Sequence, residues 1–144
     1  MTNVHAYSCR TQHDVGSPDL TDIIKDSCTP YLKRLGPFEW QGTTLDGWPA
    51  LGKDLWTRPA AKDLYDRLKT EDVVMFYGIE RCFLSARNLF KIAQGLEDMN
   101  IKVILLDLGL TLGTPASNAL FECTRRILDL PKLVSAATRE PVKV

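Results

Sequence analysis

Two uninterrupted apolar runs, DVVMFYG at 72–78 and IKVILLDLG at 101–109, constrain the fold of this chain more than any other feature. Neither run alternates apolar with polar residues, so each predicts a strand that is covered on both faces. The segment between them, at 85–100, carries apolar residues at helical spacing: Leu89, Ile92, Ala93, Leu96 and Met99. Strand, helix and strand in this order predict an α/β fold, with a mainly parallel central sheet and helices on both faces.

The first third of the chain extends this alternation. Val4–Cys9 can form a first strand, and a helix is predicted to begin at Ser17 or Asp19. Gly36 and Pro37 end that helix, and we expect Pro30 to break or kink it earlier.

Less regular segments follow before the pattern returns. PFEWQG at 37–42 is a candidate second strand, whereas 43–57 carries two glycines and a proline and predicts a long loop. Loops of this length in compact domains are often functional. Helices are then predicted from Pro59 to Leu68, with proline in the first turn, and from Pro115 to about Leu130.

Length and charge limit the function classes. The 144 residues suffice for one core, so we predict a single domain over 1–144 with no DNA-binding domain following it. The formal net charge is zero, whereas a stand-alone nucleic-acid binder usually carries a basic excess. The polar N-terminus lacks the apolar core of a signal peptide, and no stretch is long enough to span a membrane. We therefore expect a cytoplasmic protein.

The cysteines and histidines do not predict a metal site. His5, Cys9 and His13 recur every four residues, which would suit a helix, but this segment is predicted as a strand and a loop. No cofactor is implied either. The four cysteines are scattered without a CxxC pair, so reduced thiols are expected: Cys9, Cys28, Cys82 and Cys123.

Three short motifs in a fixed order point to a family. IERCFLS at 79–85 is similar to the pattern Leu-Asp-Arg-Leu-Gly-Arg-Ser, and WTRPAAKDL at 56–64 is similar to an Arg-Pro-Ala/Gly element at the head of a helix. GLTLGTPASNALF at 109–121 is similar to a Gly-Ile-x-Thr-x-Thr-Pro-Ala loop. Together the chain resembles the catalytic domain of resolvase/invertase-type serine recombinases over about 56–130.

The N-terminal strand departs from that family. Its members carry the pattern Tyr-x-Arg-x-Ser, whose serine is the nucleophile. In the best register, Tyr7 to Thr11, Thr11 occupies the nucleophile position and Cys9 the arginine position. A shifted register restores an arginine at Arg10 but puts Gln12 in place of the serine.

The resemblance implies phosphoryl transfer on DNA, in which a hydroxyl attacks a backbone phosphate and arginines stabilise the developing negative charge. Matched residue by residue, the candidate catalytic residues are Thr11, Arg58 and Arg81. Leu84 and Cys9 replace two further arginines of the cluster. We therefore expect catalysis to be impaired or absent. The residues also admit plainer roles: Arg58 as a solvated side chain and Thr11 as an ordinary strand-end threonine.

Partners follow from the same resemblance. It implies weak DNA binding and assembly with a second copy or a related recombinase subunit. Two other hypotheses stay open. One is a non-enzymatic interaction or dimerisation module on the same fold, and the other is an unrelated α/β domain that binds a phosphorylated ligand.

Overall fold

The structure is a computed structural model that describes residues 1–14 and 19–112. The helix predicted at 115–130 and the rest of the C-terminal segment lie outside these residues. The strands and helices follow in chain order: β1 (Thr2–Cys9), α1 (Leu20–Leu32), β2 (Phe38–Asp46), α2 (Pro59–Arg67), β3 (Val73–Phe76), α3 (Ile79–Cys82), α4 (Ala86–Asp98), β4 (Lys102–Leu105) and β5 (Leu110–Thr111). Short 3₁₀ turns lie between some of them: η1 (Gln12–Asp14), η2 (Trp48–Ala50), η3 (Leu55–Thr57) and η4 (Leu106–Leu108).

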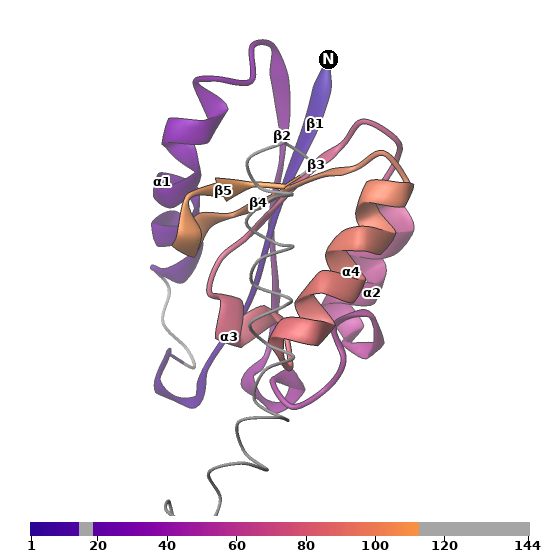
Figure 1. The fold of residues 1–144 in the computed structure, drawn as a ribbon. Coiled ribbons are helices and arrows are strands. Elements are labelled where there is room, and N and C mark those ends of the chain that lie inside the picture. Colours follow the sequence, from indigo (N-terminus) through magenta and orange to yellow (C-terminus); the bar gives the residue numbers. More distant parts are fainter. Residues whose placement is uncertain (15–18, 113–144) are drawn as a thin grey trace, which may run out of the picture. The chain divides into compact units, whose positions relative to one another are not determined.

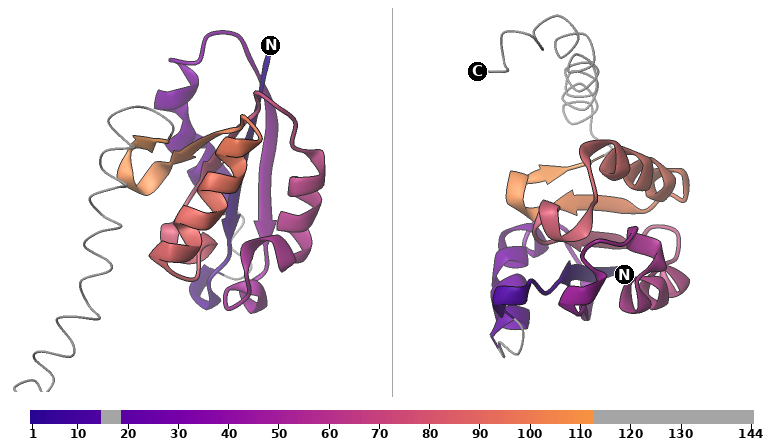
Figure 2. Two further views of the ribbon diagram at one scale, coloured as in Figure 1. Left: turned by 45° about the vertical axis from the view of Figure 1, so that its right-hand side comes forward. Right: turned by 90° about the horizontal axis from the view of Figure 1, so that it is seen from below.

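The strands form one sheet in the order β2-β1-β3-β4-β5. β2, β1, β3 and β4 are parallel, and β5 pairs antiparallel with β4. α1 lies on one face of the sheet, and α2 and α4 lie on the other (Figures 1 and 2). The predicted α/β architecture, with a mainly parallel sheet between helices, is confirmed.

The two central strands are buried on both faces, as their apolar runs predict. All four residues of β3 are buried, as are the last three of β4. Because successive side chains of a strand point to opposite faces, Val73 and Met75 pack toward α1 while Val74 and Phe76 point the other way. One apolar cluster unites the α1 face: Val4, Ala6, Leu20, Ile24, Cys28, Leu32, Val73, Met75 and Ile104.

The second strand is longer than predicted, because Gly42 is a bulge and not the end of the strand. Along β1 the register advances two residues from Val4 to Ala6, while along β2 it advances three, from Trp40 to Thr43. The extra residue lies where Gly42 has φ +100°, a conformation that favours glycine. β2 therefore continues to Asp46, and the loop predicted at 43–57 begins only after it.

One further expectation needs correction, and one strand was not predicted. α1 runs through Pro30 and ends at Leu32, so this helix tolerates the one main-chain hydrogen bond that a proline removes. The short strand β5 was not predicted, and two residues are too few to show a pattern.

A buried carboxylate from β2 holds the N-terminus of α2. Asp46 accepts hydrogen bonds from the main-chain N–H groups of Ala60 (2.8 Å) and Ala61 (2.9 Å) and from the Tyr7 hydroxyl (2.8 Å). The first N–H groups of a helix have no partner within it, and a negative charge there interacts favourably with the helix dipole. The side chain of Arg58, which precedes α2, makes no capping hydrogen bond. Asp46 therefore caps α2 from the neighbouring strand.

We expect Asp46→Ala to lower the free energy of unfolding by about 3 kcal/mol or more, because three donors lose a buried acceptor. Asp46→Asn keeps one oxygen and should lose about 1.5 kcal/mol. Urea unfolding followed by circular dichroism measures both. The control, Asp63→Ala on the exposed side of α2, should change stability by less than about 0.5 kcal/mol. Equal losses at positions 46 and 63 would contradict the capping role.

Candidate functional site

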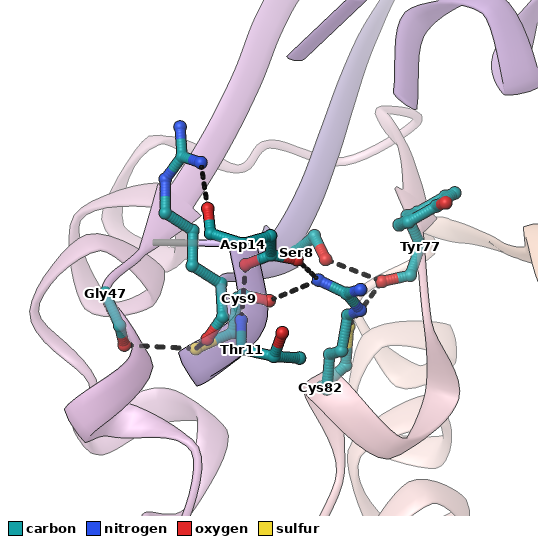
Figure 3. Close-up of polar contacts among 9 residues, drawn as sticks. Ser8, Cys9, Thr11, Asp14, Gly47, Tyr77 and Cys82 are labelled. Atoms are coloured by element: carbon teal, nitrogen blue, oxygen red, sulfur yellow. Dashed lines mark hydrogen bonds and ion pairs between the residues drawn. The ribbon is translucent and has the colours of Figure 1, made fainter. Parts of the chain in front are cut away.

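The predicted site residues gather at the carboxyl edge of the sheet. Thr11 follows the end of β1, and Arg81 lies on α3, which begins three residues after the end of β3. β1 and β3 are adjacent and parallel, so their carboxyl ends meet at one edge, where open α/β sheets bind ligands. Figure 3 shows Thr11 and Asp14 on one side of this edge, and Tyr77 and Cys82 on the other.

Gly78 allows the Arg81 side chain to turn back toward β1. Its φ of +80° favours glycine, and a Cβ at this position would lie 2.6 Å from the Arg81 Cδ. The aliphatic part of Arg81 therefore crosses directly over the main chain at the end of β3. Any larger residue at 78 would displace the Arg81 side chain.

The Arg81 guanidinium is paired within the chain. Its Nη1 donates to the main-chain oxygen of Cys9 (3.3 Å) and forms an ion pair with a carboxylate oxygen of Asp14. The guanidinium carbon also lies 5.8 Å from the centre of the Tyr77 ring. The Arg81 side chain stays 19% exposed, so part of it is open to solvent.

Asp14 connects Thr11, which follows β1, to Arg81 on α3. One carboxylate oxygen binds Arg81 and the other accepts the Thr11 amide N–H at 2.7 Å. Burial alone would raise the pKa of Asp14, but the hydrogen bonds from Arg81 and Thr11 outweigh it and lower that pKa below its ordinary value. Asp14 is therefore held as a carboxylate between the predicted nucleophile and the predicted arginine.

Arg58 lies beneath this edge and is completely buried. Its guanidinium donates to three main-chain oxygens, those of Lys53 (3.1 Å), Leu51 (3.1 Å) and Arg81 (2.7 Å). A further hydrogen bond, of 3.3 Å, goes to the Tyr7 hydroxyl. The structure thus brings Arg58 and Arg81 together, but through the main-chain oxygen of Arg81. The alternative of a solvated Arg58 side chain is wrong.

The Tyr7 hydroxyl is hydrogen-bonded to both Arg58 and a carboxylate. Its hydroxyl accepts from Arg58 and donates to Asp46. Burial, the largest influence, raises the pKa of Tyr7 strongly, which keeps the phenol protonated as a donor. The buried cation and the buried anion are therefore linked through one neutral group.

The two positions at which the resemblance predicts further arginines differ in their surroundings. Cys9 is fully buried, and its thiol donates to the Gly47 main-chain oxygen at 3.2 Å. Burial is the main cause that raises the pKa of Cys9. Leu84, by contrast, is 50% exposed. An arginine fits at 84 without repacking, whereas one at 9 has to displace packed atoms.

A hollow of about 360 Å³ adjoins Arg81 and is lined in part by Tyr77, Glu80 and Asp107. Asp107 accepts hydrogen bonds from the main-chain N–H groups of Gly78 (2.6 Å) and Ile79 (3.3 Å). These two N–H groups follow β3 at the edge of the sheet where an anion can bind. In this chain they already donate to the Asp107 carboxylate.

Further findings concern possible metal ligands, the cysteines and the helices of the described residues. Residues 1–14 and 19–112 contain no group of three or more side chains that could hold a metal ion. Cys9, Cys28 and Cys82 are free and buried. Within the same residues, every helix is too short or too polar to cross a membrane.

The sequence did not indicate Asp14 or Asp46 as part of this region. A signal for Asp14 exists, because an aspartate three residues after a strand-end threonine can accept that residue's N–H in a turn. Asp46 carried no comparable signal while residues 43–57 were interpreted as a loop. The roles of Thr11, Arg58 and Arg81 in chemistry stay predictions.

We expect Arg58→Lys to lower the free energy of unfolding by about 3 kcal/mol, because one ammonium cannot serve four separated acceptors in a buried space. Arg81→Lys should cost less than about 1 kcal/mol, because that ion pair is partly exposed. Chemical denaturation of both variants makes the comparison. A loss at 81 that equals or exceeds the loss at 58 would show that Arg58 is not the structural arginine.

The Asp14 ion pair predicts a pH dependence. Because the pKa of Asp14 is lowered on folding, its contribution is complete above the unfolded pKa of about 4 and is lost as pH falls through the folded pKa. We expect the unmodified protein to exceed Asp14→Asn in stability by about 1 kcal/mol at pH 7. This difference should shrink below about pH 4. Denaturation from pH 7 to 3 tests it, and a difference that grows in acid contradicts the ion pair.

Comparison with known proteins supports the fold independently of the motifs. No family model and no curated protein sequence matches the chain. Among solved structures, the N-terminal catalytic domain of TP901-1 integrase matches with a TM-score of 0.66 and 18% identity, covering 92% of this chain and 98% of that one. A resolvase family site-specific recombinase from Streptococcus pneumoniae matches with a TM-score of 0.53 and 13% identity, covering 98% and 99%. The chain therefore has the fold of a resolvase-type recombinase catalytic domain.

Proposed function

We propose that this domain is a serine recombinase-like catalytic domain whose strand-cleavage chemistry is impaired. The fold, and the meeting of Thr11 and Arg81 at the carboxyl edge of the sheet, support its relation to DNA strand exchange. The observation that carries the impairment is the burial of Arg58, because each nitrogen of its guanidinium donates to an acceptor of the chain itself.

The reaction requires preorganised positive charge around one phosphate. A hydroxyl attacks phosphorus, a covalent ester forms and the sugar hydroxyl departs, while negative charge builds on the non-bridging oxygens. Of the candidate arginines, only Arg81 is partly exposed, and Asp14 offsets its charge. Arg58 can reach a phosphate only by abandoning its buried partners.

The replaced positions act in the same direction. If Cys9 and Leu84 each remove one charge-assisted contact, each costs about 2–4 kcal/mol of transition-state stabilisation. Together they would slow the reaction by about three to six orders of magnitude. Thr11 adds a methyl group and a restricted χ1 at the nucleophile, which hinders in-line attack.

The proposed partners are DNA, bound weakly, and a second copy of the chain or a related recombinase subunit. The zero net charge favours weak over tight DNA binding. A second candidate function, an interaction module without catalysis, is favoured by Leu84. This large apolar side chain is 50% exposed at a position where the resemblance leads us to expect a phosphate-binding arginine.

We expect no strand cleavage and no covalent DNA adduct when the unmodified protein is incubated with supercoiled plasmid and analysed on denaturing gels. Leu84→Arg alone should fold normally but restore nothing detectable, because the nucleophile and the other missing charge are unchanged. Cys9→Arg, Thr11→Ser and Leu84→Arg together test for a trace of activity, with folding checked by circular dichroism. An adduct that the unmodified protein forms and Thr11→Ala abolishes would refute the impairment.

A further inference from the structure

The donors at the carboxyl edge of the sheet are occupied by carboxylates of the chain. Asp14 accepts from the Thr11 amide with one oxygen and pairs with Arg81 through the other. In the hollow beside Arg81, Asp107 accepts from the amides of Gly78 and Ile79. A phosphate group would use the same kind of donors, namely main-chain N–H groups and an arginine.

Asp14 is also fixed in place, and is not merely close to Arg81. Its main-chain N–H donates to the Thr11 oxygen at 3.3 Å, which closes the turn η1. Its main-chain oxygen accepts from the Arg10 guanidinium at 3.0 Å, and its side chain is only 18% exposed. The carboxylate is therefore held by the fold between the Thr11 amide and the Arg81 guanidinium.

We propose that Asp14 is an internal anion that occupies a phosphate site made by Arg81 and the Thr11 amide, and so excludes phosphate groups from it. Two oxygens of a carboxylate bridge the two donors as two oxygens of a phosphate would. Adding a phosphate beside an ionised Asp14 brings two negative charges together, which is strongly unfavourable at a partly buried site. Removing the charge of Asp14 allows a phosphate to displace this side chain from both donors.

This inference deepens the proposed function, because it concerns the anion site on which that function rests. The two can nevertheless fail separately. Phosphate binding requires no strand cleavage, so an inactive enzyme leaves the inference intact. Conversely, an active unmodified enzyme would refute the proposed impairment without deciding whether inorganic phosphate enters the site.

The experiment is a titration of Asp14→Asn with inorganic phosphate at neutral pH, followed by NMR at the Thr11 amide and the Arg81 Nε–H. Asparagine loses the ion pair with Arg81 and has no charge to repel phosphate, so phosphate can displace its side chain from both donors. The turn is retained by the main-chain hydrogen bond from Asp14 to Thr11. We expect phosphate to bind Asp14→Asn about 10-fold or more tightly than the unmodified protein. Asp14→Ala, which leaves both donors without this side chain, serves as the second variant. A titration with short duplex DNA shows whether a phosphodiester enters as well as free phosphate.

The controls separate the site from net charge. Asp63→Asn removes the same charge from an exposed position on α2 and should leave phosphate affinity within about 2-fold. Asp14→Asn combined with Arg81→Gln should return it to the unmodified level. Equal gains at 14 and 63, or a gain that survives Arg81→Gln, overturn the proposal.

The unmodified protein provides a test that needs no variant. Its Thr11 and Arg81 signals should not move with phosphate up to about 10 mM, which means that any dissociation constant for phosphate lies above about 10 mM. Saturable movement of both signals at lower concentration means that phosphate enters while Asp14 is in place, and this would overturn the proposal.

Discussion

The buried guanidinium of Arg58 is the interaction on which the carboxyl edge of this domain depends. It joins the loop after β2, through Lys53 and Leu51, to α3, through the main-chain oxygen of Arg81. Taking a cation out of water costs several kcal/mol unless its hydrogen-bonding groups are satisfied. Here acceptors surround it, and Tyr7 links it to a carboxylate. Three segments distant in the sequence are thereby locked around one charge.

This arrangement also shapes the electrostatics of the candidate site. An arginine that stabilises the fold from within adds little to the charge presented at the surface. The arginine that is partly exposed, Arg81, is paired with Asp14, and the nearby amides of Gly78 and Ile79 are paired with Asp107. The donors of this edge are therefore already paired with carboxylates of the chain. The chain thus combines a recombinase-type fold with a candidate site in which Asp14 and Asp107 already bind the donors.

The sequence predicted what depends on local pattern. The apolar runs located β3 to within two residues and the start of β4 to within one, although β4 ends four residues before its run does. The motif at 79–85 placed Arg81 just beyond the end of β3. The sequence did not predict features that depend on a residue far away in the chain. The burial of Arg58 depends in part on Tyr7, 51 residues away in the sequence, and the continuation of β2 past Gly42 depends on pairing with β1. No local pattern encodes either.

Hydrogen exchange of the arginine side chains is the most direct test of the buried role of Arg58. In ¹⁵N NMR, a guanidinium fixed by four acceptors in a buried space shows slow proton exchange at Nε and separate Nη signals. Arg34, which is exposed on the surface, provides the reference for free exchange in the same spectrum. We predict that the Arg58 protons exchange at least about 100-fold more slowly than those of Arg34, as expected for groups released only by local unfolding. Exchange of Arg58 as fast as that of Arg34 would contradict the account, because it would mean that this guanidinium is open to solvent and available to an external anion.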